Sequence, residues 1–145
     1  FCCNFKISRR KRLLKQALTT TRKYPMLSQD LILDHYHHPR NFGTLRHATH
    51  HAETENLSCG DSLAMDIVVK DDIIEEIRWT GNGCALSQAS ASLLSEAIHG
   101  RSVEYTQHIS KEDIFALLGT EMLSPARTRC ALLPMEVFVR IFEKL

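Results

Sequence analysis

The sequence has no hydrophobic stretch long enough to cross a membrane and no internal repeat. The longest run without a charged residue, 79–95, includes Asn82, Gln88 and four serines, whereas a membrane-spanning helix needs about 20 consecutive, mostly apolar residues. No segment recurs at a period of about 20–50 residues, which excludes solenoids and other repeat proteins. With 145 residues, of which 43% are hydrophobic and 24% are charged, the chain has the composition of one globular domain.

The chain also lacks a signal-peptide hydrophobic region and a Cys-x-x-Cys pair. Its five cysteines are an odd number, which does not suit the disulfide framework of a secreted protein. We therefore expect a reducing compartment and a cytoplasmic location, where thiols more often serve metal binding or chemistry than disulfides. Free cysteine is also among the most buried residue types, so simple burial in the core is the competing interpretation.

Acidic residues are absent from the first part of the chain. Residues 1–25 contain eight lysines and arginines, while the other 120 residues contain 10 basic and 17 acidic residues, a net charge of −7. We predict that 1–25 is a basic tail outside the fold, upstream of a true start at Met26, and that 26–145 is the domain. The alternatives for the tail are an organelle transit segment or a nucleic-acid-binding arm. The acidic body argues against nucleic acid as a partner, and no membrane partner is expected.

The spacing of apolar residues predicts the elements of the body. Residues 54–80 form a meander in which Leu63, Met65 and Ile67 point to one face and Asp71-Asp72 provides a turn. Helical spacing follows, and turn and capping residues set the bounds. The predicted helices run from Ser28 to His38, from Cys84 to Gly100 and from Ser110 to Gly119, and a last one begins at Pro134. Strands followed by helices indicate an α+β fold, a small antiparallel three-stranded sheet with helices packed on one face.

Three cysteines of the body fall at the boundaries of these elements. Cys59 lies in a turn between strands, Cys84 lies between a strand and the long helix, and Cys130 precedes the last helix. If these boundaries converge at one end of the sheet, the three thiols meet the carboxylate of Asp61. Three sulfurs and one oxygen form a ligand set that suits zinc or an iron–sulfur cluster. The competing interpretation of Asp61 is that it only satisfies its own turn.

Local charges are expected to favour the thiolate forms. Cys84 lies at a helix N-terminus, and Arg127 and Arg129 are close to Cys130 in the sequence; both settings lower the pKa of a thiol. Glycines 60, 81 and 83 allow the backbone to approach a metal or cluster closely, or to take a positive φ. Six histidines cluster before Cys59, and we expect most of them to face solvent, with one as a candidate extra ligand. They are His35, His37, His38, His47, His50 and His51.

Five segments taken in order resemble the U-type iron–sulfur assembly proteins, which are IscU, SufU and the N-terminal domain of NifU. The segments are LILDHY at 31–36, HPRNFG at 38–43, NLSCGD at 56–61, GNGCALSQASAS at 81–92 and ARTRCAL at 126–132. The resemblance implies that Cys59, Cys84 and Cys130 are sulfur ligands and sulfur acceptors. It also implies that Asp61 is the family's aspartate, which ligates zinc in some members and keeps a cluster exchangeable.

The segment around Cys130 departs from both branches of the family. IscU proteins have a histidine before the third cysteine and a Leu-Pro-Pro-Val-Lys segment for a chaperone, but this chain has Arg129 and no such segment. Arg127 followed by Cys130-Ala131 resembles SufU instead. However, SufU proteins carry an insertion between the second and third cysteines, and the 45 residues here are too few to contain it. The chain is therefore intermediate between the two branches.

The resemblance implies two alternative functions that share one site for zinc or a [2Fe–2S] cluster. In the first, the protein is a non-enzymatic scaffold that accepts sulfur on Cys130, supported by Arg127, from a cysteine desulfurase and assembles and transfers a [2Fe–2S] cluster. In the second, a zinc-bound sulfurtransferase passes persulfide sulfur to a separate scaffold. The expected partners are a cysteine desulfurase and cluster-recipient or downstream scaffold proteins, with a homodimer left open. A zinc-stabilised interaction module and a cysteine hydrolase are weaker alternatives.

Overall fold

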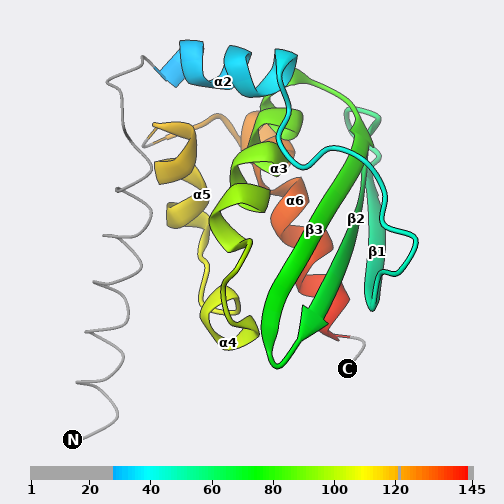
Figure 1. Ribbon diagram of the computed structural model, residues 1–145. Coiled ribbons are helices and arrows are strands. Elements are labelled where there is room, and N and C mark those ends of the chain that lie inside the picture. Colours follow the sequence, from blue (N-terminus) through cyan, green and yellow to red (C-terminus); the bar gives the residue numbers. More distant parts are fainter. Residues whose placement is uncertain (1–27, 121, 144–145) are drawn as a thin grey trace, which may run out of the picture.

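The computed structural model describes residues 28–120 and 122–143, and the predicted basic tail at 1–25 lies outside them. Three antiparallel strands form a meander in the order β1-β2-β3. Helices α3 and α6 pack on the sheet, and α2 and α5 pack against α3 (Figure 1). The α+β prediction is thereby confirmed. The elements are α2 (Ser28–His37), β1 (His50–Asn56), β2 (Asp61–Lys70), β3 (Ile73–Asn82), α3 (Ala85–Ile98), α4 (Val103–Thr106), α5 (Lys111–Leu118) and α6 (Pro125–Glu143).

The β2–β3 hairpin forms as predicted, with one irregularity. Asp71 and Asp72 have φ of 51° and 64°, the backbone of a tight hairpin turn in which aspartate is tolerated. Val68 is paired with Glu76 and Val69 with Ile74, so β3 has an extra residue at this point. This bulge shifts the alternation of β3 by one residue. Ile74 is therefore buried, whereas Ile73 is 39% exposed.

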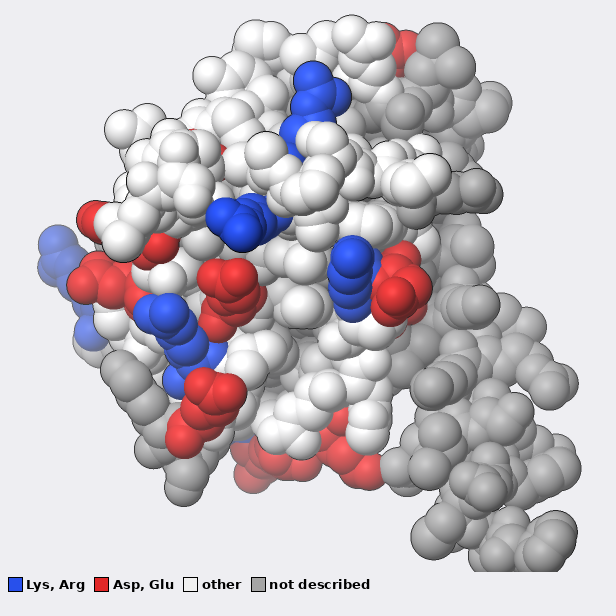
Figure 2. Space-filling model, turned by 180° about the vertical axis from the view of Figure 1, so that it is seen from behind, with Lys and Arg blue, Asp and Glu red and all other residues white. Residues whose placement is uncertain are grey.

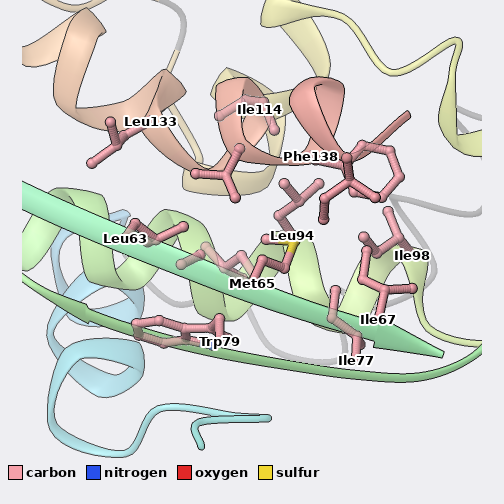
Figure 3. Packing of buried hydrophobic residues seen from close by; sticks show 14 of the residues in the cluster. Leu63, Met65, Ile67, Ile77, Trp79, Leu94, Ile98, Ile114, Leu133 and Phe138 are labelled. Atoms are coloured by element: carbon pink, nitrogen blue, oxygen red, sulfur yellow. The ribbon is translucent and has the colours of Figure 1, made fainter. Parts of the chain in front are cut away.

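The core lies between the inner face of the sheet and the helices. Leu63, Met65 and Ile67 of β2 point toward Leu94 of α3 and Phe138 of α6 (Figure 3). Each of these five side chains is buried, and burying one such side chain stabilises the fold by roughly 1.5–3 kcal/mol. The inward alternation of β2 continues to its first residue, and this places Asp61 on the same buried face. The core thus fixes the direction in which this carboxylate points.

The helix ends are set by residues that the sequence identifies. Gly100, with φ of 74°, follows the C-terminus of α3. Ser110 precedes α5, its backbone N–H donates to the Asp113 carboxylate at 2.8 Å, and Gly119 ends that helix with φ of 71°. These features are the expected N-terminal and C-terminal caps. None of the described helices is long and apolar enough to cross a membrane.

The prediction for the last helix is wrong in one respect. Helix α6 begins at Pro125, and Pro134 lies inside it and is buried. A proline fits the first turn of a helix, and Pro125 occupies that position while Pro134 does not. Because Pro134 has no N–H, it cannot donate to the carbonyl of Cys130 four residues earlier. Cys130 therefore lies in α6, not before it.

Candidate metal centre

Four residues from three parts of the chain converge at the end of the sheet where β3 leads into α3, the upper end in Figure 1. They are Cys59 in the β1–β2 turn, Asp61 at the start of β2, Cys84 before α3 and Cys130 in α6. Ligand atoms of Cys59, Asp61 and Cys130 lie within 4.8 Å of one another. Cys84 adjoins this group, because its Sγ donates to Asp61 Oδ2 at 3.4 Å. The structure thus brings together all four predicted site residues.

The β1–β2 turn places Cys59 at the surface and Asp61 in the interior. The side-chain oxygen of Asn56 accepts a hydrogen bond from Ser58 N–H at 3.1 Å, and the Asn56 carbonyl accepts one from Gly60 N–H at 2.8 Å. Gly60 has φ of 73°, which a glycine adopts without steric cost. The turn leaves Cys59 exposed, whereas Asp61 is 3% exposed.

The Asp61 carboxylate is the acceptor at the centre of the group. The Cys84 N–H donates to Oδ1 at 3.1 Å, in addition to the thiol contact at Oδ2. Burial by itself raises the pKa of Asp61. Hydrogen bonds from the Cys59 and Cys84 thiols, the Cys84 amide and the Cys130 thiol outweigh burial and hold that pKa below its ordinary value. The carboxylate is therefore ionised at neutral pH.

Gly83 permits this approach, because it leaves room for the carboxylate. A Cβ added at Gly83 would lie 2.5 Å from both Cγ and Oδ1 of Asp61. The sequence predicted a close approach of the backbone to a metal or cluster at this glycine, and the group that it approaches is the Asp61 carboxylate. At Gly81, an added Cβ would lie 2.7 Å from the Ser62 carbonyl oxygen of the neighbouring strand. The two glycines therefore let backbone segments pack around Asp61, which is a role that spacing alone did not assign.

Cys84 is the N-cap residue of α3, as its predicted position at a helix N-terminus requires. Its sulfur accepts a hydrogen bond from the Ser87 N–H at 3.5 Å. The Ser87 hydroxyl in turn donates to the Cys84 carbonyl at 3.1 Å. Thiol and hydroxyl therefore replace the usual capping side chain at this helix end. Sequence reasoning did not single out Ser87, although its place three residues after a capping cysteine was a usable signal.

Cys130 is the buried member of the group, with 8% exposure. Its Sγ lies 3.6 Å from the Sγ of Cys59. Burial, then the hydrogen bond with Cys59 and the nearby Cys84 and Asp61, raises the pKa of the Cys130 thiol well above its ordinary value. The expectation that Arg127 and Arg129 would lower this pKa is wrong. Both arginines are exposed, and Arg129 Nη1 donates to Ser58 Oγ at 3.4 Å.

The spacing of the donor atoms fits a tetrahedral metal ion. Two thiolates bound to zinc at about 2.3 Å and at the tetrahedral angle are about 3.8 Å apart, and a thiolate and a carboxylate oxygen are about 3.5 Å apart. The Cys59–Cys130 distance is 3.6 Å and the Cys84–Asp61 distance is 3.4 Å. Both pairs are therefore close to the separation that a bound ion requires, and three thiols and one carboxylate suit zinc or iron.

No described histidine joins this group of potential ligands. His50 and His51 are held by Thr49 and Asp66, through Nδ1 contacts of 2.7 and 2.6 Å. His35 is 4% exposed and is the exception to the expectation that most of these histidines face solvent, which holds for His37, His38, His47 and His51. The His35 Nδ1 lies 2.7 Å from Ser92 Oγ, and this contact joins α2 to α3.

Charged side chains are interspersed on the surface. On the back face in Figure 2, lysines and arginines lie among aspartates and glutamates, and most of the carboxylates are in the lower half.

The described cysteines outside the 1–25 segment are all free, and two of them, Cys59 and Cys84, are exposed. The site is therefore open to solvent through these two thiols and closed at Cys130.

The profile of the NifU-like N terminal domain matches residues 27–142. The chain therefore belongs to this family, as the five sequence segments indicated. It is 34% identical over 124 residues to the zinc-dependent sulfurtransferase SufU of Bacillus subtilis, covering 74% of this chain and 83% of that protein. It is 35% identical over 107 residues to the iron–sulfur cluster assembly scaffold protein IscU of Aquifex aeolicus, covering 72% of this chain and 67% of that protein.

A solved structure has the same fold. The crystal structure of a protein assigned to iron–sulfur cluster assembly by the SUF system of Fervidobacterium islandicum AW-1 matches with a TM-score of 0.64 and 27% identity. The match covers 77% of this chain and 93% of that chain. The relatives thus include both a scaffold and a sulfurtransferase, the two alternatives that the sequence left open.

Proposed function

We propose that this protein is an iron–sulfur cluster assembly scaffold, which accepts sulfur from a cysteine desulfurase and assembles and transfers a [2Fe–2S] cluster. The observation that carries this proposal is the convergence of three thiols on one buried carboxylate, with Cys59 and Cys130 sulfurs 3.6 Å apart. Membership of the NifU-like family and the similarity to an IscU scaffold support it. The protein is then a carrier of its product and not an enzyme.

In this proposal Cys59, Asp61, Cys84 and Cys130 hold either zinc or the cluster at one shared site. A resident zinc ion would supply Lewis acidity, which keeps bound thiols deprotonated. This matters most for Cys130, because burial and the neighbouring Cys59, Cys84 and Asp61 raise the pKa of its thiol and keep it protonated without metal. The carboxylate of Asp61 is a harder and weaker ligand for cluster iron than a thiolate. A site with one such ligand releases its cluster more readily than a site of four thiolates.

Sulfur acceptance is assigned to Cys130, with Arg127 in support. The Cys130 thiolate attacks the terminal sulfur of the desulfurase persulfide, and the desulfurase cysteine leaves as a thiolate. Cys130 is buried, and the exposed Cys59 covers its sulfur at 3.6 Å. This step therefore requires the β1–β2 turn, which carries Cys59, to move aside. The exposed Arg127, one helical turn before Cys130, is close enough along α6 to attract the incoming negative charge.

The acceptor assignment is tested by mapping the persulfide. After incubation with a cysteine desulfurase and cysteine, wild-type protein is alkylated and digested, and the extra sulfur is located by mass spectrometry. We expect it on Cys130 and expect Cys130→Ser to carry none. A normal yield of persulfide on Cys59 in that variant moves the acceptor role to Cys59.

A zinc-bound sulfur shuttle is the second candidate function, in which the protein passes persulfide sulfur to a separate scaffold. It is favoured by the similarity to a zinc-dependent sulfurtransferase and by donor distances that suit one tetrahedral ion. The same four residues would hold the zinc, and a thiol released from it would accept sulfur. In this case the protein would have sulfurtransferase activity.

Anaerobic reconstitution separates the two functions. Protein is mixed with a cysteine desulfurase, cysteine and ferrous iron, and then metal content, acid-labile sulfide and the visible spectrum are measured. A sulfide-containing chromophore that moves to an apo-ferredoxin supports the scaffold. Zinc that stays bound, without a chromophore but with faster cysteine turnover, supports the shuttle. If neither result is obtained, sulfur traffic is not the function of this site.

A further inference from the structure

The thiols of Cys59 and Cys130 are in direct contact. Their Sγ atoms are 3.6 Å apart, although 71 residues separate them in the chain. Cys130 is held in α6 and buried, whereas Cys59 is exposed in the β1–β2 turn. The turn has room to adjust, because nothing lies within 4 Å of a Cβ added at Gly60. A disulfide needs an S–S distance of about 2.05 Å, so a small movement of the turn would join the two sulfurs.

Sulfur that arrives as a persulfide is not yet in the oxidation state that a cluster contains. The terminal persulfide sulfur is formally zero-valent, whereas cluster sulfide carries two more electrons. Those electrons must come from a reductant, and a pair of thiols supplies two when it becomes a disulfide. An adjacent thiol is therefore the simplest source of these electrons at this site.

We propose that Cys59 and Cys130 act as this internal reductant and release the delivered sulfur as sulfide. One thiol of the pair carries the persulfide and the other attacks the inner sulfur of that persulfide. A Cys59–Cys130 disulfide forms, the bond between the two persulfide sulfurs breaks, and the terminal sulfur leaves as hydrosulfide. The proton of the attacking thiol is lost to solvent or leaves on the sulfide as hydrogen sulfide. The inference rests on the proposed function in one respect, namely that a persulfide is delivered here.

A dithiol reductant, either a small molecule or a protein, returns the pair to its starting state by reducing the disulfide through thiol–disulfide exchange. The exposed Cys59 sulfur is the side from which such a reductant has access. Reduction restores both thiols to the ligand set. The Cys84 sulfur has other contacts, because it lies 3.4 Å from Asp61 Oδ2 and 3.7 Å from Ser87 Oγ.

The experiment uses the full chain, metal-free and anaerobic, loaded with glutathione persulfide so that no desulfurase is needed. Excess reagent is removed by gel filtration, and persulfide per chain and free sulfide are followed with time. Trypsin cleaves after arginine and lysine, so Cys59, Cys84 and Cys130 fall on the separate peptides 47–70, 79–101 and 130–140. A disulfide between any two of them is therefore identified by mass without ambiguity.

We expect about one sulfide for each persulfide lost, together with a disulfide-linked pair of peptides 47–70 and 130–140. Glutathione persulfide, unlike a desulfurase, does not select one cysteine, so Cys59→Ser and Cys130→Ser are each expected to load sulfur from it on the remaining thiol of the pair. Each variant should release sulfide at least about tenfold more slowly. The control variant is Ser58→Ala, which changes the exposed residue next to Cys59 and leaves every sulfur atom in place. It should release sulfide at the wild-type rate.

Three results would overturn the inference. They are a persulfide that persists on the wild-type protein, a Cys84 peptide in place of one of the pair, or unchanged release from Cys59→Ser. These results leave the scaffold and shuttle functions standing, because an external reductant could then supply the electrons. Conversely, loading by glutathione persulfide but not by any desulfurase would remove the proposed function and leave the chemistry of the pair intact.

Discussion

At the scale of single residues, Asp61 determines the geometry of the site. It is buried at the first position of β2, and it accepts hydrogen bonds from the Cys84 amide and from surrounding thiols. These bonds hold the carboxylate in one orientation without metal. A carboxylate placed in this way is a preformed ligand, yet a weaker one for iron than the thiols around it.

Replacement of Asp61 by alanine is expected to slow cluster loss. The variant lacks the labile oxygen ligand that a recipient would displace, and we expect release to slow by about threefold to tenfold. The rate is measured as transfer of a reconstituted cluster to an apo-ferredoxin. The control is Asp66→Ala on the same strand, where the carboxylate binds His51 and the Leu45 amide away from the thiols. Release at the wild-type rate from Asp61→Ala would contradict this account of the carboxylate.

Gly83→Ala is expected to weaken metal binding, because its Cβ would occupy the place of the carboxylate, 2.5 Å from Oδ1. Asp61 must turn away, and we expect zinc affinity to fall by about 10–100-fold in a competition titration with a chelator. Gly100→Ala is the matched control, since it has φ of 74° and open space around it, far from the thiols. That variant should cost about 1 kcal/mol of stability and leave zinc affinity unchanged. Equal affinities in both variants would mean that Asp61 does not bind the metal.

At the scale of elements, the sequence predicted the hairpin, α3 and α5 well, because each has a strong local signal. Asp71-Asp72, Gly100 and the Ser110–Asp113 pair are such signals, and the backbone follows them. The start of α6 was predicted wrongly because Pro125 and Pro134 both suit the first turn of a helix, and the prediction took Pro134. Pro134 is buried in the helix, where packing on the sheet and on α3 outweighs the missing hydrogen bond. Tertiary packing of this kind cannot be read from local propensity.

Buried serines hold helix α3 against its neighbours, a role that the sequence analysis did not assign to them. Ser90 Oγ donates to the Ala131 carbonyl of α6 at 2.6 Å, beside Cys130, and Ser92 Oγ accepts from the Arg40 N–H at 2.9 Å. The four site residues were predicted from expected positions at element boundaries, although Cys130 lies inside α6. The contacts that hold those boundaries together depend on three-dimensional packing, so the sequence did not predict them.

Ser90→Ala is expected to loosen α6 next to Cys130. Loss of one buried hydrogen bond should lower the free energy of unfolding by about 1 kcal/mol in urea. Because Ala131 adjoins Cys130, alkylation of the Cys130 peptide by a thiol reagent should also become faster. The comparison variant is Ser102→Ala, which removes the cap of α4 at a distance from the thiols and should destabilise the fold without exposing Cys130. Equal alkylation rates in the two variants would show that Ser90 does not position this cysteine.

At the scale of the whole molecule, a buried histidine joins helices α2 and α3. His35 of α2 lies against Ser92 of α3, and the next loop is fixed by the Arg40–Asp34 ion pair at 2.7 Å and by the Trp79 indole N–H donating to the Arg40 carbonyl at 2.8 Å. The sequence predicted the helix that carries His35 but not its burial, because a histidine near a helix end ordinarily faces water. Packing of α2 on α3 decided otherwise.

Acid is therefore expected to destabilise the fold through His35. Burial, and then the charge of Arg40, lowers the pKa of His35 from 6.5 to about 4, although Asp34 opposes this. Between these two values the unfolded chain binds a proton that the folded protein does not, so stability is complete above pH 6.5 and is lost as the pH falls toward 4. The contribution is about 2–3 kcal/mol.

Urea unfolding of the metal-free, reduced protein at about pH 7 and about pH 4.5 measures this contribution. His35→Gln should be less stable at neutral pH but lose that much less on acidification, whereas His47→Gln, at an exposed position, should behave like the wild type. An unchanged pH dependence in His35→Gln would assign the acid sensitivity to other groups.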